Sequence, residues 1–289
     1  MYPQIFKDSK LQEQFDTEGY VIIPLLDKED IEKLTTIFHE MHRELQENRF
    51  GASSGLQDIN LKHQIRDTLY PVYLPYFEKT FKEYTYFGSS FLYKTPGKNS
   101  DLAPHQDWTI VDEKNAVAIN IWTPLCDTSE ENGTLYVVPK SQTTKLFSLR
   151  APTIPFYFQK YFSTVIKCAV PTNAKAGHAV VLNQSLIHYS SPNLSRDIRI
   201  AITSGIKTKD APMLFHFKNE RNEIERYQMP EDFLLSFKDF QKDIYLRPEN
   251  GTFVSNIPYM PPSIGKFKFI QQFGKERFTL LQKIREIFR

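Results

Sequence analysis

The sequence predicts a mainly β protein with flanking helices, and a jelly-roll barrel accounts best for its strands. Short β-branched and aromatic runs begin at about residue 89, turns rich in Pro and Gly separate them, and few helical stretches lie between them. Of the 289 residues, 40% are hydrophobic and 24% are charged, which is enough apolar material for one core. We therefore expect a single domain over residues 1–289, with its core at about 14–210.

The N-terminal part of the core combines one short strand with one long helix. A loop that begins near residue 14 should turn at Gly19 into a strand from Tyr20 to Pro24. The helix should run from Leu26 to about Asn48, because apolar residues recur there at spacings of three and four and acidic residues gather at its start, where the helix dipole favours them. We expect this helix to pack one face on a sheet.

One insertion interrupts the later series of predicted strands, and a segment of different composition follows the series. Its strands are the runs SSFLYKT, AVAINIWTPL, TLYVVP, HAVVLN and RIAITSGIK. Residues 145–175 carry several prolines and many aromatic residues, so we expect a lid-like insertion or substrate loop there. Residues 211–289 are predicted as a helical and aromatic extension, whose last helical stripe we interpret as core or interface packing. The stripe consists of Phe278, Leu281, Ile284 and Phe288.

Charge and composition argue against several partner classes. The chain has 36 basic and 34 acidic residues, and its net charge of +2 gives no large field to attract nucleic acid or an anionic membrane. Its two cysteines, Cys126 and Cys168, form no CxxC pair and predict no disulfide framework. The first residues do not resemble a secretory signal, and no stretch approaches the roughly 18 apolar residues of a membrane span. We expect a cytoplasmic protein, without membrane insertion, that acts on a small-molecule substrate. The sequence does not indicate an oligomeric state.

The segment APHQDWT, residues 103–109, contains two predicted metal ligands. In an extended strand, residues two apart project from the same face, so His105 and Asp107 can bind one metal while Gln106 points away. The third predicted ligand is His188, which follows the apolar run HAVVLN. Two histidines and one carboxylate on one face of a metal leave positions open for other ligands, an arrangement typical of ferrous oxygenases. Zinc and manganese also bind these groups, so the choice of Fe(II) depends on the redox requirement as well.

An arginine follows at a spacing that indicates a co-substrate. Arg199 lies eleven residues after His188 in the strand segment IRIAITSG, and its guanidinium can pair in bidentate fashion with the far carboxylate of 2-oxoglutarate. Asn120 shares a strand face with Trp122 by alternation, which makes it a candidate donor to the keto acid.

Together these segments resemble the phytanoyl-CoA dioxygenase family of Fe(II)/2-oxoglutarate oxygenases. FDTEGYVIIPLLDKEDIEKL resembles the N-terminal signature of that family, and HQD resembles its first iron motif. NIWTPLCDTSEENGTLYVVPKSQ resembles its central strand pair, and AGHAVVLNQSLIHYSSPNLSRDIRIAI its distal segment. The resemblance covers about residues 14–206 and implies a double-stranded β-helix, the cupin-like form of the jelly roll.

The resemblance also implies roles for individual residues and a set of cofactors. The implied iron ligands are His105, Asp107 and His188. Arg199 would anchor 2-oxoglutarate, and the co-substrate site would be lined by Gln106, Trp122 and Ser190. Fe(II), 2-oxoglutarate and O2 are then the expected cofactors. Halogenating relatives have a small residue in place of the carboxylate of Asp107, so its presence favours a hydroxylase that oxidises an unactivated C–H bond and releases succinate and CO2.

Two departures from the family pattern concern turns and substrate contacts. His178 stands where the family usually has an acidic residue, and PKSQ replaces a PGSH-like ending. His39 and His42 lie three apart on the first helix and could bind a metal on one face, but we interpret them as a partly exposed pair. His63, His178 and His216 have no ligand-spaced carboxylate partner, and we interpret them as structural or at most substrate-side groups. Trp108 either packs at the barrel mouth or contacts the substrate.

Other functions fit the same residues. A jelly-roll metalloenzyme that does not use 2-oxoglutarate would bind iron but release no succinate, and a non-catalytic binding protein on this scaffold would show no turnover. The 23 Phe and 15 Tyr suggest a small, partly apolar metabolite such as a lipid-like or terpenoid substrate. An amino acid, free or carrier-bound, and a fatty acyl-CoA are the alternatives.

Overall fold

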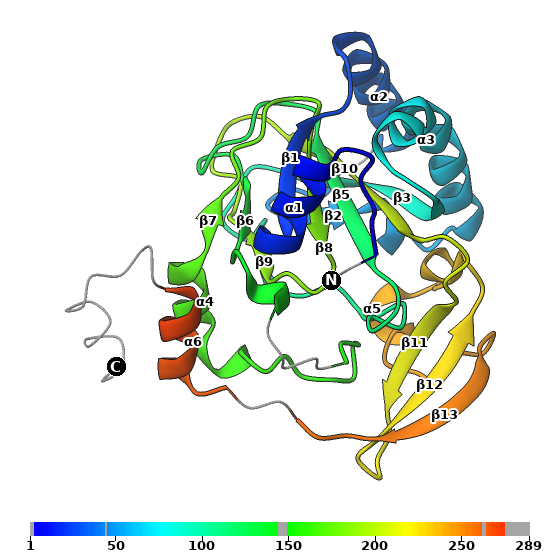
Figure 1. Cartoon of the computed structure of the whole chain (residues 1–289). Coiled ribbons are helices and arrows are strands. Elements are labelled where there is room, and N and C mark those ends of the chain that lie inside the picture. Colours follow the sequence, from blue (N-terminus) through cyan, green and yellow to red (C-terminus); the bar gives the residue numbers. More distant parts are fainter. Residues whose placement is uncertain (1–2, 44, 144–148, 262–263, 275–289) are drawn as a thin grey trace.

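The computed structural model describes residues 3–43, 45–143, 149–261 and 264–274, and its largest element is a six-stranded antiparallel sheet (Figure 1). The strand order is β1-β8-β5-β10-β3-β2. The bounds are β1 (Tyr20–Pro24), β8 (His178–Asn183), β5 (Ala118–Pro124), β10 (Arg199–Thr208), β3 (Tyr84–Lys94) and β2 (Phe50–Ala52). The predicted strand from Tyr20 to Pro24 is confirmed.

A smaller four-stranded sheet faces the first. Its order is β4 (Leu102–His105), β9 (His188–Ser190), β6 (Leu135–Val137) and β7 (Val170–Pro171). Trp122 and Val180 of the larger sheet share one buried cluster with Leu135 and Val137 of the smaller, so the sheets pack face to face. The prediction of a mainly β protein with flanking helices is confirmed, but among the described residues no strand pairing joins the two sheets into a closed barrel.

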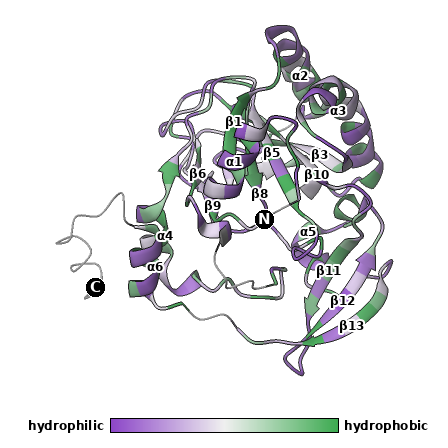
Figure 2. Ribbon diagram, in the orientation of Figure 1, coloured by the Kyte–Doolittle hydropathy of each residue, from purple (hydrophilic) through white to green (hydrophobic). Residues whose placement is uncertain are grey.

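Helices cover the other face of the six-stranded sheet (Figure 1). They are α1 (Ser9–Glu18), α2 (Lys28–Met41) and α3 (Ile59–Thr80). Their buried side chains, Phe15, Phe38 and Phe77 among them, form one core with Ile121 and Ile202 of the sheet. The green hydrophobic stretches of the central strands in Figure 2 agree with this burial.

Two N-terminal predictions need correction. The expected loop before Gly19 is the helix α1, whose first turn is capped by the carboxylate of Asp8 and which ends at Gly19 with a φ of 84°. The glycine is therefore a helix C-terminus as well as the turn into β1. The predicted helix from Leu26 to Asn48 is shorter, because α2 begins after the capping side chain of Asp27 and ends at Met41.

The region after residue 210 begins with strands where the sequence predicted helices. β11 (Met213–Lys218), β12 (Glu223–Met229) and β13 (Thr252–Pro258) form a three-stranded antiparallel sheet. Between β12 and β13 lie the short helices η4 (Phe233–Leu235) and α5 (Phe240–Asp243). The helix α6 (Lys266–Phe273) packs against α4 (Phe162–Cys168), which lies beside it in Figure 1. The predicted stripe at Phe278, Leu281, Ile284 and Phe288 lies outside the described residues.

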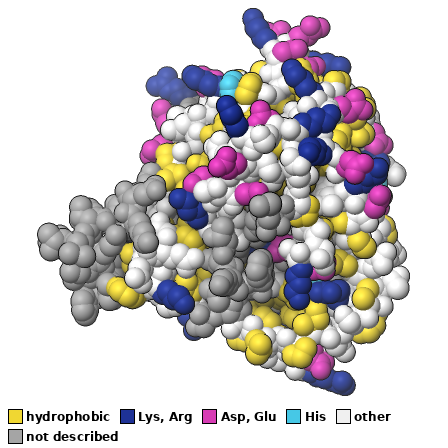
Figure 3. Space-filling view, viewed as in Figure 1, with side chains coloured by type: hydrophobic (Ala, Val, Ile, Leu, Met, Phe, Trp, Pro, Cys, Tyr) yellow, Lys and Arg dark blue, Asp and Glu magenta, His cyan; other side chains and the backbone are white. Residues whose placement is uncertain are grey.

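The described residues also form three further 3-10 turns. The turns are η1 (Ser53–Gly55), η2 (Ser141–Thr143) and η3 (Gln159–Tyr161). On the face seen in Figure 3, basic and acidic side chains are interspersed, in keeping with the net charge of +2. None of the helices in the described part of the chain has the length and apolarity that a membrane crossing requires.

Candidate metal centre

Two paired strands bring the three predicted metal ligands together. His105 ends β4 and His188 begins β9, and the two residues are direct partners in the antiparallel register. Their ring centroids lie 4.2 Å apart. Oδ1 of Asp107 is 3.9 Å from Nε2 of His105 and 3.8 Å from Nε2 of His188. One ligand atom from each residue therefore lies within 4.8 Å of the other two, a group that can hold a single metal ion.

Hydrogen bonds orient both imidazoles for coordination through Nε2. Nδ1 of His105 lies 2.8 Å from the carbonyl oxygen of Ala103, and Nδ1 of His188 lies 2.9 Å from that of Leu186. Since a carbonyl only accepts, Nδ1 carries the proton in each ring and Nε2 keeps its lone pair. Burial, reinforced by the neighbouring His188, lowers the pKa of His105 to about 4. His105 is thus neutral at physiological pH, which metal binding requires.

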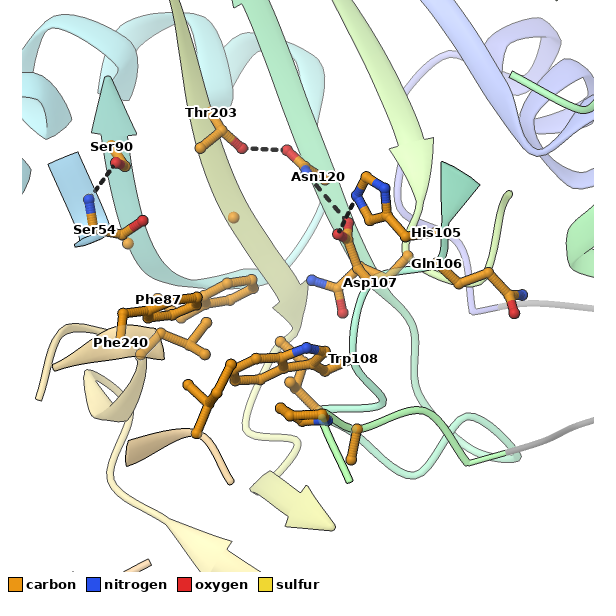
Figure 4. A pocket seen from close by; sticks show the side chains of 18 of the residues that line it. Ser54, Phe87, Ser90, His105, Gln106, Asp107, Trp108, Asn120, Thr203 and Phe240 are labelled. Carbon is orange, nitrogen blue, oxygen red and sulfur yellow. Dashed lines mark hydrogen bonds and ion pairs between the residues drawn. The ribbon is translucent and has the colours of Figure 1, made fainter. Parts of the chain in front are cut away.

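A chain of side chains from two central strands orients the carboxylate (Figure 4). Nδ2 of Asn120 on β5 donates to Oδ2 of Asp107 over 3.2 Å. Oδ1 of Asn120 in turn accepts from the hydroxyl of Thr203 on β10. The sequence predicts that Asn120 donates to a keto acid, and the hydrogen bond present here is to the metal ligand. Asp107 is left with Oδ1 directed at the histidines.

Arg199 is a buried cation beside the aromatic ring of Trp122. Its side chain is 1% exposed, and its Nε and Nη1 have no hydrogen-bond partner among the described residues. The guanidinium carbon lies 5.5 Å from the centroid of the Trp122 ring. Burial lowers the pKa of Arg199 to about 10, so the group stays charged at neutral pH. A buried cation with free donors is suited to bind a carboxylate.

Lys94, a residue that the sequence analysis missed, lies opposite Arg199. The two are cross-strand partners of β3 and β10. Nζ of Lys94 donates to the carbonyl oxygens of Ser190 and Ser191 on the facing sheet. Burial, followed by the charge of Arg199, lowers the pKa of Lys94 to about 6. Lys94 is therefore mainly neutral at pH 7 and leaves Arg199 as the cation of this pair.

The other predicted cofactor residues fall into two groups. Gln106 lines a cavity next to the metal ligands, where its Nε2 donates to the carbonyl of Ser185 and its Oε1 has no partner among the described residues. Asn120 lines the same cavity. Trp122 and Ser190 are instead buried between the two sheets, on the side of Arg199. Gln106 and Asn120 thus line the cavity, whereas Trp122 and Ser190 are buried away from it.

The cavity has a volume of about 490 Å³ and is walled by segments from three parts of the chain. Strand residues form one side, among them Phe87, Gly88 and Gly205. The segment predicted as a lid contributes Ala151, Pro152, Ile154 and Phe156. The region between β12 and β13 contributes Leu234, Leu235, Phe240, Ile244 and Tyr245. Sequence reasoning missed this last wall because the residues follow no periodic pattern.

Arg150 connects the predicted lid segment to the metal-ligand loop. Its Nε donates to the backbone oxygen of Asp107 over 2.8 Å, and its guanidinium pairs with both carboxylate oxygens of Glu113. The backbone of Arg150 also makes two hydrogen bonds with Thr109: its carbonyl accepts from the Thr109 N–H, and its N–H donates to the Thr109 hydroxyl. The position of Asp107 therefore depends on Arg150 as well as on β4.

The remaining histidines have structural contacts. His216 is buried, with Nδ1 3.0 Å from the carbonyl of Thr109, and burial lowers its pKa to about 4. His42 was expected to be partly exposed but is buried, stacked on Phe38 and 2.9 Å from the hydroxyl of Ser53. His63 lies 3.9 Å from a carboxylate oxygen of Asp232. These contacts agree with a structural role.

Comparison with known proteins identifies phytanoyl-CoA dioxygenases as relatives of this chain. The sequence model described as phytanoyl-CoA dioxygenase (PhyH) matches residues 15–201. Phytanoyl-CoA dioxygenase 1 of Oryza sativa subsp. japonica is 32% identical over 117 residues, which cover 40% of this chain and 42% of the relative. Phytanoyl-CoA dioxygenase of Arabidopsis thaliana is 28% identical over 153 residues, 50% of each chain. The chain thus matches about half the length of these relatives.

Solved structures share the fold at low sequence identity. The non-heme alpha ketoglutarate dependent carbocyclase SnoK from nogalamycin biosynthesis superposes with a TM-score of 0.56 at 16% identity, covering 71% of this chain and 86% of SnoK. The epimerase SnoN, in complex with Fe3+, alpha ketoglutarate and nogalamycin RO, gives 0.51 at 14% identity over 86% and 95% of the two chains. Because the family match spans well over half of the sequence and includes the three converging side chains, this chain belongs to the phytanoyl-CoA dioxygenase family.

Proposed function

We propose that this protein is a non-haem Fe(II)- and 2-oxoglutarate-dependent oxygenase, and that it hydroxylates a C–H bond of a small, partly apolar molecule. The observation that carries the proposal is the convergence of His105, Asp107 and His188 with both Nε2 atoms directed at one carboxylate oxygen. This donor set suits Fe(II) and leaves coordination positions for other ligands. The Fe3+ and alpha ketoglutarate bound to SnoN, a protein of the same fold, support the choice of cofactors.

Arg199 would hold the far carboxylate of 2-oxoglutarate. Its guanidinium is buried and has two nitrogens without a partner in the described part of the chain, so a carboxylate that binds there replaces no existing ion pair. Ser190 lies two residues after His188 on β9 and is buried in the same interior, where its hydroxyl can add a second donor. Trp122 packs against the guanidinium and limits its movement.

Each of the other residues of the site has a positioning role. Asn120 and Thr203 hold the carboxylate of Asp107, and Arg150 holds its backbone. Bound iron would activate O2, so that one oxygen atom enters succinate, with loss of CO2, and the other enters the substrate as a hydroxyl group. Residues 151–156, which belong to the predicted lid at 145–175, and the segment at 233–245 wall the cavity and would exclude water during this step.

We interpret the two facing sheets as the halves of a double-stranded β-helix, with the metal ligands at the edge of the smaller half. Residues 145–175 would then form the lid of a single oxygenase domain. The proposal also includes a cytoplasmic location and a small-molecule partner, which agree with the mixed surface charge.

The test is anaerobic addition of Fe(II) and 2-oxoglutarate to the purified protein. We expect a weak visible charge-transfer band, which Asp107→Ala should abolish and Asp101→Ala, a change at an exposed carboxylate nearby, should preserve. Release of succinate across a panel of substrates then measures turnover. Iron binding without succinate would indicate a metalloenzyme of another kind, and binding of a small molecule without turnover would indicate a non-catalytic protein. Either result would overturn the proposal.

A further inference from the structure

We propose that the cavity beside the metal ligands binds an uncharged, compact and mainly hydrocarbon substrate, which lies against Trp108 and Phe87 and on the exposed backbone of Gly88. The inference deepens the proposed function, on which it depends for the oxidation that follows binding. The binding itself can be measured separately.

The charge of the cavity wall excludes an ionic substrate group. Among the described residues that line the cavity, the ionisable ones near the metal are His105 and Asp107, and no lysine or arginine is present. Without bound iron, a carboxylate or phosphate brought into this wall would lose its water without gaining a cation, and such an unpaired buried charge is strongly disfavoured. The buried cations Arg150 and Arg199 do not line the cavity, and the guanidinium of Arg150 is paired with Glu113.

Rigid aromatic rings provide one wall. The rings of Trp108 and Phe240 are nearly parallel, with an interplanar angle of 8° and centroids 5.9 Å apart. Phe215 and Phe237 contact the indole edge-on, with centroids 6.0 Å and 6.2 Å away. Figure 4 shows Trp108, Phe240 and Phe87 on one side of the cavity, with Asp107 above Trp108 in this view. Since Trp108 is fixed from several directions, it offers a preformed apolar surface close to the reacting position.

A β-bulge provides the opposite surface. In the pairing of β3 with β10, Gly88 lies opposite Gly205 and Tyr86 opposite Ile206, so Phe87 is an extra residue on its strand. A bulge of this kind redirects a side chain, and both Phe87 and Gly88 line the cavity. The ring of Phe87 covers Gly205, where an added Cβ would lie 2.1 Å from that ring.

Gly88, in contrast, is uncovered. A Cβ built on this residue meets no atom within 4 Å, although the residue lies inside a strand of the main sheet. Glycine inside a strand weakens the strand and often marks a place where a ligand approaches the backbone. The covered Gly205 and the open Gly88 together make a shallow recess, and a bulky hydrocarbon body fits it better than a polar chain does. The side chains of Ser90 and Ser54, which line the cavity, can accommodate one neutral polar substituent.

The volume is consistent with this class of molecule. Small-molecule sites occupy roughly 300–1,000 Å³ and are mostly apolar with a few polar groups. The cavity of about 490 Å³ lies in the lower half of that range. A compact ring system fills such a space, whereas a long acyl chain would have to leave it.

Two adamantane derivatives with the same cage test the charge argument on the full-length protein without iron, in which no metal can bind the carboxylate. We expect adamantan-1-ol to bind at least tenfold more tightly than adamantane-1-carboxylate, measured by titration calorimetry and by tryptophan fluorescence. Fluorescence is informative because the chain has two tryptophans, of which Trp108 lines the cavity and Trp122 is buried between the sheets. In Asp107→Asn, which removes the negative charge nearby, the carboxylate should still bind weakly. Absence of alcohol binding, or equal affinities for the two compounds, would overturn the proposal.

Substitution of the open glycine tests the location. Gly88→Val should weaken adamantan-1-ol binding at least tenfold and leave the Fe(II)/2-oxoglutarate band intact. The matched control is Gly265→Val, since an added Cβ there also meets no atom within 4 Å but Gly265 is exposed at the start of α6. If Gly88→Val does not fold, Gly88→Ala adds the single carbon for which space is open, and a threefold loss is expected. Unchanged affinity in the folded variant would refute the site. Absence of the band from the wild-type protein, with adamantan-1-ol still bound, would refute the proposed function and leave the cavity proposal standing.

Discussion

Replacement of Arg199 by methionine should stabilise the protein in the absence of ligands. The guanidinium is 1% exposed, two of its nitrogens lack partners in the described structure, and burial lowers its pKa from 12.5 to about 10. One pKa unit corresponds to about 1.4 kcal/mol, so the buried charge costs at most about 3 kcal/mol. Because the folded-state pKa of this base is lowered, the cost is fully present at pH 7 and is relieved only as the pH rises above about 10. Water that reaches the group reduces the cost.

The same substitution should abolish the response to 2-oxoglutarate. A bidentate pair supplies two charge-assisted hydrogen bonds of about 1.5–3 kcal/mol each, so its loss should weaken binding about 10²- to 10⁴-fold. A ligand at 100 times its dissociation constant stabilises the folded state by about 2.7 kcal/mol, which is about 4–5 °C in thermal midpoint for a domain of 289 residues. The wild-type protein with Fe(II) should show this shift when 2-oxoglutarate is added, and Arg199→Met should not.

Scanning calorimetry under argon measures both effects. Arg196→Met is the matched control, because Arg196 is exposed three residues earlier, and it should change neither the ligand-free midpoint nor the shift. The reasoning is refuted if Arg199→Met lowers the ligand-free midpoint by many degrees, since the cation would then have a stabilising partner. It is also refuted if the variant keeps the full 2-oxoglutarate shift.

Two further predictions concern the neighbours of the metal ligands. Asn120→Ala removes the donor to Oδ2 of Asp107 and should weaken Fe(II) binding about 10- to 100-fold, as measured by competition with a chelator; an unchanged affinity would exclude a role in orienting the carboxylate. Burial lowers the pKa of Lys94 to about 6. Above that pH the unfolded chain binds a proton that the folded chain lacks, so the free energy of unfolding should rise with pH. The expected slope is about 1.4 kcal/mol per pH unit between pH 7 and pH 9. Lys94→Met should remove this slope in urea denaturation, and an equal slope in both proteins would contradict the assignment.

The closeness of His105 and Asp107 could be predicted because the two residues are only two apart in the sequence. The strand alternation behind that prediction applies only in part, because β4 ends at His105 and Asp107 lies in the loop after it. The distal ligand, His188, required a resemblance to known sequences, since the pairing of β4 with β9 is a long-range contact. Arg199 was predicted from its spacing, and the structure adds that its guanidinium is buried and only partly satisfied.

Other features depend on tertiary contacts that no local pattern shows. The helix α3 contains Pro71 and Pro75, which argue against a helix when only local propensity is considered. Both prolines lie on its exposed side, where water can satisfy the freed carbonyls, while Leu69, Tyr73 and Phe77 are buried against the sheet. Packing therefore outweighs the local preference. In the same way, the strands after residue 210 are defined by their pairing with one another and not by a strong alternation.

The residues that would catalyse the reaction and those that would determine substrate specificity lie in different parts of the chain. The region that matches the family contains the metal ligands and Arg199, whereas the wall at 233–245 lies beyond residue 201. His105, His188 and Arg199 lie on paired strands, and Asp107 lies in the loop directly after β4. Strands fix a metal site more tightly than appended segments can, and appended segments vary more freely. Arg150 is the physical link between the two, because its backbone belongs to the cavity-lining segment and its side chain holds Asp107. A substrate that contacts residues 151–156 would thus affect the position of Asp107 through Arg150. Substrate binding in the cavity and the geometry of the metal ligands are therefore coupled through this guanidinium.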